Sequence, residues 1–323
     1  MQDTLPQGFI PVMLTPFKDN GDIDFEGLTQ LTELYLQAGA AGLFANCLSS
    51  EMYELTEDER LAITRHVVEV ANGRVPVVAT GTFGGAIAEQ AEFAKKIYAT
   101  GIQAVIVITS LLADADESDE VFMERMNELL HLTPGVIYGL YECPVPYKRL
   151  VRAKDLGELA ATGRVVYHKD TSLDIDNVKS KIAATQGQRF GVYDAYMEHA
   201  VASLQAGSAG LSCIQGNFFP EIIVWLCANY NNPDQQASVA RVQQMLIETM
   251  PVIHYAYPTV AKYYLQKRGF PISLYTRRKV EECTAEVKTE VDALYERVEA
   301  LSTELGISAK TSSYPIVKLS TSA

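Results

Sequence analysis

Residues 75–109, VPVVATGTFGGAIAEQAEFAKKIYATGIQAVIVIT, contain the unit from which we predict the whole fold. A short apolar run, Val75–Thr80, precedes residues 86–101, where apolar side chains recur at the i, i+3, i+4 and i+7 spacing of an amphipathic helix. A second apolar run, Ala104–Thr109, ends the unit. Parallel strands need a long crossover connection, so this pattern predicts a βαβ unit with parallel strands.

The same unit recurs along the chain as far as residue 230. Glycines follow several of the helical patterns, as is typical of a left-handed helix C-cap; they are Gly73, Gly101 and Gly163. Eight units without a break predict an α/β protein with a closed (β/α)8 TIM barrel over residues 1–230. The expected strands are the apolar runs Phe9–Leu14, Gly42–Asn46, Val75–Thr80, Ala104–Thr109, Val136–Tyr141, Val165–Lys169, Arg189–Tyr193 and Gly210–Ile214.

The chain beyond residue 230 has a different pattern. The polar stretch NYNNPDQQ interrupts the repeat, and three helical patterns follow, over Ala237–Thr249, His254–Arg268 and Arg277–Leu305. We therefore expect a C-terminal three-helix appendage over residues 231–308, packed on the barrel. Residues 309–323 are rich in Ser and Thr, a composition that predicts a flexible tail.

Composition and charge exclude several classes of protein. Of the 323 residues, 48% are apolar and 21% are charged, which is typical of a globular protein rather than a disordered one. The net charge of −13 disfavours partners with phosphate backbones or anionic lipid surfaces, so we expect neither nucleic-acid nor membrane binding. No apolar run approaches the roughly 20 residues of a membrane span. Any site for a small anion must be built locally.

Cysteine usage and the N-terminal sequence predict a cytoplasmic protein. The odd number of cysteines and the absence of a CxxC pair favour reduced thiols over disulfides or a zinc site. Residues 1–9 lack the basic and apolar regions of a secretory signal, so none is expected. The five cysteines are Cys47, Cys143, Cys213, Cys227 and Cys283.

Lys169 is the strongest candidate for a catalytic residue. Active sites of such barrels lie at the C-terminal ends of the strands, and Lys169 ends the apolar run of RVVYHKDTS (residues 164–172). It is the only lysine embedded in an apolar strand pattern. Burial lowers the pKa of an amine, and a neutral lysine forms a Schiff base with a ketone. The alternative is a lysine that pairs with a neighbouring carboxylate.

Tyr141 ends the preceding strand and is the second candidate. Period-2 alternation predicts two inward-facing sets on adjacent strands: Ile137, Gly139 and Tyr141, and Val165, Tyr167 and Lys169. Tyr141 and Lys169 are then expected to meet at the barrel mouth. A phenol there can transfer protons. Alternatively, Tyr141 is an aromatic that only fills the barrel.

A Ser-containing turn is the third candidate. In GLFANCLSSEMYELTEDER (residues 42–60), a strand is expected to end near Asn46 and a helix to begin after the capping pattern Thr56–Glu59. The hydroxyls and backbone N–H groups of Ser49 and Ser50 are suited to hold a carboxylate.

A metal site is the main rival to this interpretation. Its possible ligands near strand ends are His168, Glu142, Asp170 and Asp194. Alternation argues against it: if Lys169 faces inward, His168 and Glu142 face the surrounding helices. The glycine-containing stretches GTFGG and AGSAG lack the context of a Walker or dinucleotide motif. We therefore expect no metal and no organic cofactor.

Five motifs together resemble the dihydrodipicolinate synthase/N-acetylneuraminate lyase family of pyruvate-dependent class I aldolases, from Gly8 to at least Gly269. The resemblance implies that Lys169 forms the Schiff base, that Tyr141 relays protons, and that the loop at Ser49 and Ser50 binds the keto-acid carboxylate. It also implies a homotetramer, commonly a dimer of dimers. The motifs are GFIPVMLTPFKDNGDID, SSEMYELTEDER, YECP, HKDTS and GVYDAY.

Further substrate contacts are expected from the last two strands. GVYDAY is similar to a segment of the lyase branch, which implies that Tyr193 and Asp194 lie near the tail of the substrate. Ser212, in the eighth apolar run, completes the expected substrate-binding set.

The sequence departs from the family pattern mainly where a second substrate would bind. Leu48 replaces one of the two hydroxyl residues of the carboxylate loop, and Ser50 replaces its glycine. Leu111 and Leu112 stand where the synthases have a tyrosine pair that completes a proton relay. Pro146 stands where they have an arginine, with Lys148 and Arg149 nearby at a different spacing.

These observations predict a Schiff-base lyase that cleaves or condenses a 2-keto acid, with pyruvate as one partner. A dehydratase or deaminase is an alternative, because the same imine acidifies C3. Two further alternatives are a dihydrodipicolinate synthase-like synthase and a non-catalytic protein that binds a keto acid. The small-molecule keto acid is the expected ligand in every case.

Overall fold

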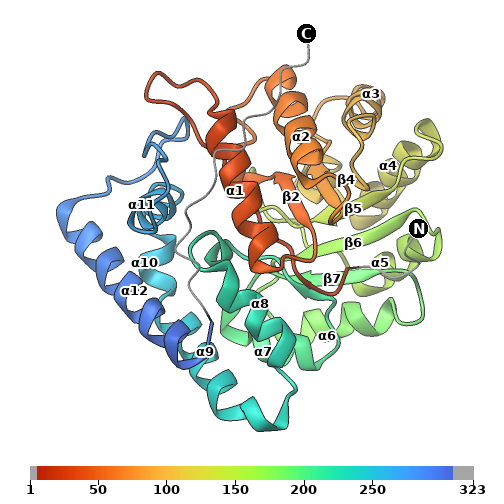
Figure 1. The fold of residues 1–323 in the computed structure, drawn as a ribbon. Helices are drawn as coiled ribbons and strands as arrows, with labels where there is room; N and C mark the ends of the chain where they lie inside the picture. Colours follow the sequence, from red (N-terminus) through yellow and green to blue (C-terminus); the bar gives the residue numbers. More distant parts are fainter. Residues whose placement is uncertain (1–5, 308–323) are drawn as a thin grey trace.

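The computed structural model describes residues 6–307, and its centre is an eight-stranded parallel barrel surrounded by helices (Figure 1). The strand order is β1-β8-β7-β6-β5-β4-β3-β2, and a parallel bridge between Val12 and Phe44 joins the first segment to β2. The predicted (β/α)8 barrel is confirmed. The strands are β1 (Gly8–Phe9), β2 (Leu43–Asn46), β3 (Val77–Thr80), β4 (Ala104–Ile108), β5 (Tyr138–Tyr141), β6 (Val165–Asp170), β7 (Gly191–Asp194) and β8 (Gly210–Leu211).

The helices follow from local signals in the sequence. At the start of α2, the Thr56 hydroxyl accepts a hydrogen bond from the Glu59 N–H at 3.3 Å, and the Glu59 carboxylate accepts one from the Thr56 N–H at 2.9 Å, as the capping pattern predicted. The barrel helices are α1 (Phe25–Ala38), α2 (Glu57–Ala71), α3 (Ile87–Tyr98), α4 (Asp119–Leu132), α5 (Ala153–Ala161), α6 (Ile175–Ala184), α7 (Ala200–Gln205) and α8 (Pro220–Asn229).

The first predicted strand is divided at a proline. The Ile10 N–H donates to Leu211 of β8, whereas the Pro11 carbonyl accepts from the Phe44 N–H and the Met13 N–H donates to Phe44 of β2. Pro11 has no N–H to donate, so the chain changes partner there instead of continuing one ladder. This change of partner closes the barrel.

A bulge in β6 corrects one predicted side-chain direction. Tyr138 pairs with Val165 but Gly139 pairs with Tyr167, so Val166 is an extra residue. Val165 therefore packs in the core between strands and helices, and the expectation that it shares a face with Lys169 is wrong. Tyr167 lies in the cluster of buried side chains inside the barrel, as predicted.

The described part of the C-terminal region, residues 231–307, contains four α-helices where three were predicted. They are α9 (Gln236–Glu248), α10 (Met250–His254), α11 (Thr259–Lys267) and α12 (Ala285–Glu304). The second predicted helix is broken because Pro258 disfavours a helical conformation at Tyr257. The third begins at Ala285 rather than Arg277, after its N-cap Thr284, whose hydroxyl accepts from the Val287 N–H.

These four helices lie together on one side of the barrel, drawn in cyan to blue in Figure 1. Their apolar side chains, such as Val242 and Val298, belong to the same core cluster as those of the barrel helices. The appendage and the barrel therefore share one continuous core. The predicted tail at residues 309–323 lies outside the described residues. Within residues 6–307, no helix has the length and apolar character needed to cross a membrane.

Candidate active site

Lys169 and Tyr141 meet inside the barrel at the ends of β6 and β5. They are register partners on these adjacent strands, and the Lys169 Nζ lies 4.3 Å from the centre of the Tyr141 ring. Only 4% of Lys169 is exposed. Among residues 6–307, no carboxylate forms an ion pair with it. The alternative of a carboxylate-paired lysine is therefore not realised in the described part of the chain.

Burial controls the ionisation of Lys169. It lowers the pKa of the Lys169 amine below its ordinary value, and the nearby thiols of Cys47, Cys143 and Cys213 oppose this shift. Burial also raises the pKa of Cys143, and it raises that of Cys213 to about 12. These two thiols stay neutral near pH 7 and place no full negative charge beside the amine. The site therefore favours a neutral, nucleophilic lysine.

Tyr141 is held as a neutral phenol. Burial raises its pKa well above the ordinary value, and its hydroxyl makes a hydrogen bond with the side chain of Cys143. Its ring packs edge-on against Phe44 of β2, with centroids 5.9 Å apart. A rigid neutral phenol beside an amine is suited to donate a proton to an oxygen bound at the same carbon as that amine.

The structure separates the two serines of the predicted carboxylate loop. They lie in a short turn, η1 (Leu48–Ser50). The Ser50 hydroxyl donates to the Met13 carbonyl at 2.6 Å and accepts from the Cys47 N–H at 3.1 Å, so it fastens the turn to the first strand segment. Ser49 instead contacts the hydroxyl of Tyr257. Of the two hydroxyls, that of Ser49 is available to a ligand.

Tyr193 does not reach the barrel mouth. Its ring stacks on Tyr167, with centroids 4.7 Å apart, and its hydroxyl donates to the Pro6 carbonyl at 2.6 Å. Pro6 precedes β1, so this hydroxyl points to the end of the barrel opposite the strand C-termini. Tyr193 fills the barrel interior instead of facing the tail of a substrate.

Asp194 and Ser212 are also engaged within the protein. Asp194 accepts from the Tyr196 N–H at 2.9 Å and pairs with His199 at 2.8 Å, outside the barrel interior. The Ser212 hydroxyl lies inside, where it donates to the Ile10 carbonyl at 2.9 Å and accepts from Tyr167 at 3.3 Å. Ser212 therefore borders the barrel interior, and Asp194 does not.

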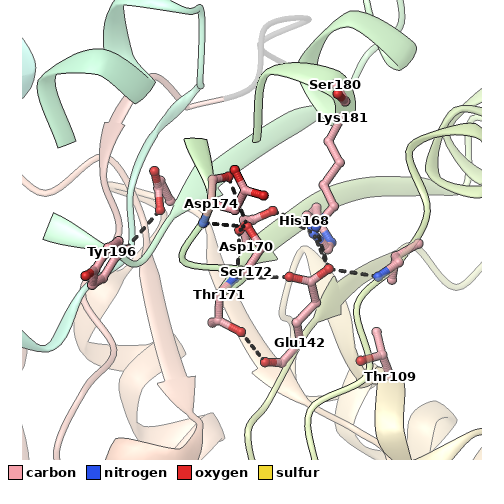
Figure 2. Close-up of polar contacts among 12 residues, drawn as sticks. Thr109, Glu142, His168, Asp170, Thr171, Ser172, Asp174, Ser180, Lys181 and Tyr196 are labelled. Atoms are coloured by element: carbon pink, nitrogen blue, oxygen red, sulfur yellow. Dashed lines mark hydrogen bonds and ion pairs between the residues drawn. The ribbon is translucent and has the colours of Figure 1, made fainter. Parts of the chain in front are cut away.

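A buried ionic cluster of Glu142, His168, Asp170 and Lys181 lies on the outer face of the same strands (Figure 2). We call it the outer cluster. The prediction that Glu142 and His168 face the helices is confirmed. The Lys181 Nζ, which reaches in from α6, lies 2.5 Å from a Glu142 oxygen and 2.6 Å from an Asp170 oxygen.

The outer cluster brings together three of the four residues of the metal alternative. Ligand atoms of Glu142, His168 and Asp170 lie within 4.8 Å of one another, whereas Asp194 pairs elsewhere. The Lys181 ammonium, however, already occupies the space between the two carboxylates. Burial raises the pKa of Glu142, but His168 and Lys181 outweigh burial and bring it down to about 2. These residues fit an internal ion network better than a metal site.

The loop after β5 provides no free guanidinium at the mouth. Arg149 is buried, with its guanidinium 3.0 Å from Asp119 and hydrogen-bonded to the carbonyls of Asp114 and Glu117. The Lys148 Nζ donates to the Thr171 carbonyl, at the end of β6, at 2.7 Å.

A cavity of about 460 Å³ lies beside this loop. Its lining is shared by the loops that follow β3, β4 and β5, including Gly84, Leu111, Leu112, Pro146 and Tyr147. The positions where the synthases carry their tyrosine pair and their arginine therefore line the same cavity. In this chain these positions are Leu111, Leu112 and Pro146, whose side chains are apolar.

Sequence reasoning missed Tyr257 and the role of the cysteines. Tyr257 lies in the C-terminal region, where an aromatic residue near a helix is normally a packing residue, and no local motif marked it. Three of the cysteines follow a strand directly or within two residues: Cys47 after β2, Cys143 after β5 and Cys213 after β8. This placement at the strand C-termini could have indicated from the sequence that they lie near the site.

The comparisons with known proteins point to one family. The model of the dihydrodipicolinate synthetase family matches residues 5–298. A 4-hydroxy-tetrahydrodipicolinate synthase of Bacillus subtilis is 26% identical, over 80% of this chain and 88% of that protein. The putative 2-dehydro-3-deoxy-D-gluconate aldolase YagE of Escherichia coli K12 is also 26% identical, over 84% of this chain and 90% of that protein.

Solved structures show the same fold. The crystal structure of YagE from E. coli K12 in complex with pyruvate has a TM-score of 0.81 at 23% identity, covering 91% of this chain and 98% of that one. A monomeric dihydrodipicolinate synthase variant has a TM-score of 0.82 at 20% identity, and the match covers 95% of this chain and 99% of that one.

Proposed function

Because the chain belongs to the dihydrodipicolinate synthetase family, we propose that it is a pyruvate-dependent class I aldolase-type lyase whose Lys169 forms a Schiff base with a 2-keto acid. The observation that carries this proposal is the buried Lys169 amine beside Tyr141 at the strand C-termini. Burial lowers the pKa of the amine and so favours its neutral form, and no ion pair within residues 6–307 engages it.

The proposed reaction proceeds through an imine. The Lys169 nitrogen attacks the C2 carbonyl, and Tyr141 donates a proton so that the carbinolamine loses water. The resulting iminium withdraws electrons from the C3–C4 bond. The Tyr141 phenolate takes the proton of the C4 hydroxyl as this bond breaks, which releases an aldehyde and leaves the enamine of pyruvate. Tyr141 returns the proton to C3, and hydrolysis of the iminium by water then releases pyruvate, restores the amine and reprotonates Tyr141. Every step uses groups of this chain and water.

Borohydride trapping tests the proposal directly. With pyruvate, borohydride should reduce the imine and attach a pyruvyl group to Lys169, as seen by intact mass and peptide mapping. Lys169→Ala should abolish the label. Lys262 is a matched internal control: it is also buried, but it is paired with Glu51 at 3.2 Å and should stay unlabelled. An unlabelled wild-type protein, or a label on Lys262, contradicts the proposal.

A panel of 2-keto acids in the same assay identifies the substrate. Release of an aldehyde supports carbon–carbon cleavage, whereas release of water or ammonia without an aldehyde indicates a dehydratase or deaminase. A chelator should leave trapping unchanged, because the Lys181 Nζ already lies between the two carboxylates of the outer cluster.

We also propose that the enzyme is a cytoplasmic homotetramer, arranged as a dimer of dimers. All five cysteines are unpaired, as is usual in a reducing compartment. The assembly itself rests on the resemblance to the family. Size-exclusion chromatography with light scattering tests it, and a monomer or a dimer at micromolar concentration contradicts it.

A further inference from the structure

Tyr257 reaches the barrel from the segment between α10 and α11. Asn217, in the short turn that follows β8, donates an amide N–H to the Tyr257 hydroxyl oxygen at 2.6 Å. The same amide donates to the Val12 carbonyl at 2.9 Å, and its oxygen accepts from the Tyr35 hydroxyl at 2.7 Å. Asn217 is thus fixed by three partners, and it holds the phenol oxygen in one place.

The Tyr257 hydroxyl meets the available serine of the η1 turn. It makes a hydrogen bond with the Ser49 side chain. Its oxygen already accepts from Asn217, so its own proton remains for donation to Ser49 or to a ligand between them. Ser49 follows the C-terminal end of β2, and Asn217, which holds the Tyr257 hydroxyl, follows the C-terminal end of β8. The hydroxyl pair therefore lies at the same end of the barrel as the reactive amine of Lys169.

Backbone conformation on both sides of this pair is strained. Ala256 precedes Tyr257 with φ 51°, and Glu51 follows the serine turn with φ 59°, which are left-handed values that residues other than glycine rarely adopt. The Glu51 carboxylate is fixed by the Lys262 Nζ and by the Arg277 N–H at 2.7 Å. Such strain persists where the surroundings impose it, and it clusters at ligand sites.

We propose that Tyr257 is a substrate-binding residue whose hydroxyl, together with that of Ser49, binds the carboxylate of the 2-keto acid. This inference rests on the proposed function and deepens it. Leu48 stands where the predicted carboxylate loop would have a second hydroxyl. The Tyr257 phenol, which comes from the C-terminal region, provides a second hydroxyl donor beside Ser49. The C-terminal region therefore contributes to the site and not only to packing. The ligand it selects is a keto acid rather than an uncharged ketone.

The test compares a charged and an uncharged ketone in the borohydride assay. Pyruvate carries the carboxylate, whereas methyl isopropyl ketone has an isopropyl group in its place. In Tyr257→Phe, the pyruvate concentration that gives half-maximal trapping should rise roughly 10- to 100-fold, as expected for the loss of a hydrogen bond to a charged group. Trapping of methyl isopropyl ketone should be unchanged.

Tyr263→Phe is the matched control. Tyr263 lies in α11, and its hydroxyl donates to Asp292 at 3.1 Å, away from Ser49. This variant should trap both ketones like the wild type. If Tyr257→Phe does not fold, Tyr257→Met is used in the same assay. The methionine side chain also lacks a hydroxyl, and its flexibility allows it to fill irregular space.

The outcomes separate this inference from the proposed function. A wild-type protein that traps no ketone overturns the proposed function, and this inference with it. A wild-type protein that is trapped, with an unchanged pyruvate response in the Tyr257 variant, overturns this inference alone. An equal loss for both ketones also overturns it, because it assigns Tyr257 a structural role.

Discussion

The Nζ of Lys169 lies over the ring of its register partner Tyr141, 4.3 Å from the ring centre. Parallel pairing places both residues at the same level of the barrel, and alternation turns both inward. An amine and a phenol placed in this way can act on one carbonyl group, the amine on its carbon and the phenol on its oxygen. The catalytic roles proposed above depend on this pairing.

Removal of the Tyr141 hydroxyl should slow turnover without weakening binding. A positioned acid–base group contributes ~10²–10⁴-fold in rate, so Tyr141→Phe should lose about that factor in kcat. The pyruvate concentration for half-maximal trapping should change little, because the phenol acts on the transition state. Steady-state kinetics and trapping measure the two quantities separately. A rate loss of less than about threefold would make Tyr141 a packing residue.

The rate of imine formation should rise with pH through a pKa below the usual lysine value of about 10.4. Burial lowers the pKa of Lys169, and only the unprotonated amine attacks the carbonyl. Single-turnover trapping with pyruvate across pH 6–10 gives this pKa. A rate that keeps rising up to the ordinary lysine pKa contradicts the effect of burial.

The two serines of the η1 turn should have opposite phenotypes. Ser50→Ala leaves the Cys47 N–H without its side-chain acceptor and the Met13 carbonyl with only the weak thiol donor of Cys47 at 3.8 Å, and should cost roughly 1–3 kcal/mol of unfolding free energy. Ser49→Ala should leave stability nearly unchanged but weaken pyruvate binding. Urea denaturation and trapping distinguish them. Equal stability losses in both variants argue against the division of roles.

Glu142 should stabilise the fold in a pH-dependent way. Its pKa in the folded protein is about 2, below the value of an unfolded chain, so its contribution is present above about pH 4.5 and is lost as the pH falls toward 2. Glu142→Gln leaves Lys181 without one buried partner and should cost roughly 3–5 kcal/mol at pH 7. Urea unfolding at pH 7 and at pH 4 should show a smaller difference between variant and wild type at the lower pH. A difference that is independent of pH contradicts this account.

The protein should be a poor dihydrodipicolinate synthase. Pro146 provides no donor for the carboxylate of aspartate semialdehyde, and Arg149 is committed to Asp119 and to backbone carbonyls. Loss of a bidentate, charge-assisted pair and of the relay tyrosines should slow the reaction on the order of a thousandfold or more. A coupled assay with pyruvate and aspartate semialdehyde measures it. Turnover near the median of about 10 s⁻¹ for ordinary enzymes would show that another donor binds the aldehyde.

The sequence alone was sufficient for the barrel and for the two central residues. Periodicity is local: a period of two along a strand and of 3.6 along a helix decides which side chains share a face. It therefore predicted that Lys169 and Tyr141 face inward and that Glu142 and His168 face the helices. It failed at Val165, because a bulge depends on the partner strand as well as on the residue itself.

Only the tertiary structure decided which polar groups are available to a ligand. The Ser50 hydroxyl is occupied because barrel closure brings Met13 beside it, and the Tyr193 hydroxyl is turned away because Pro6 lies within reach. Tyr257 joins Ser49 because the C-terminal helices pack against the barrel. Sequence periodicity reports only which neighbouring residues share a face. A hydrogen-bond partner that is distant in sequence can therefore be identified only once the fold has brought the two segments together.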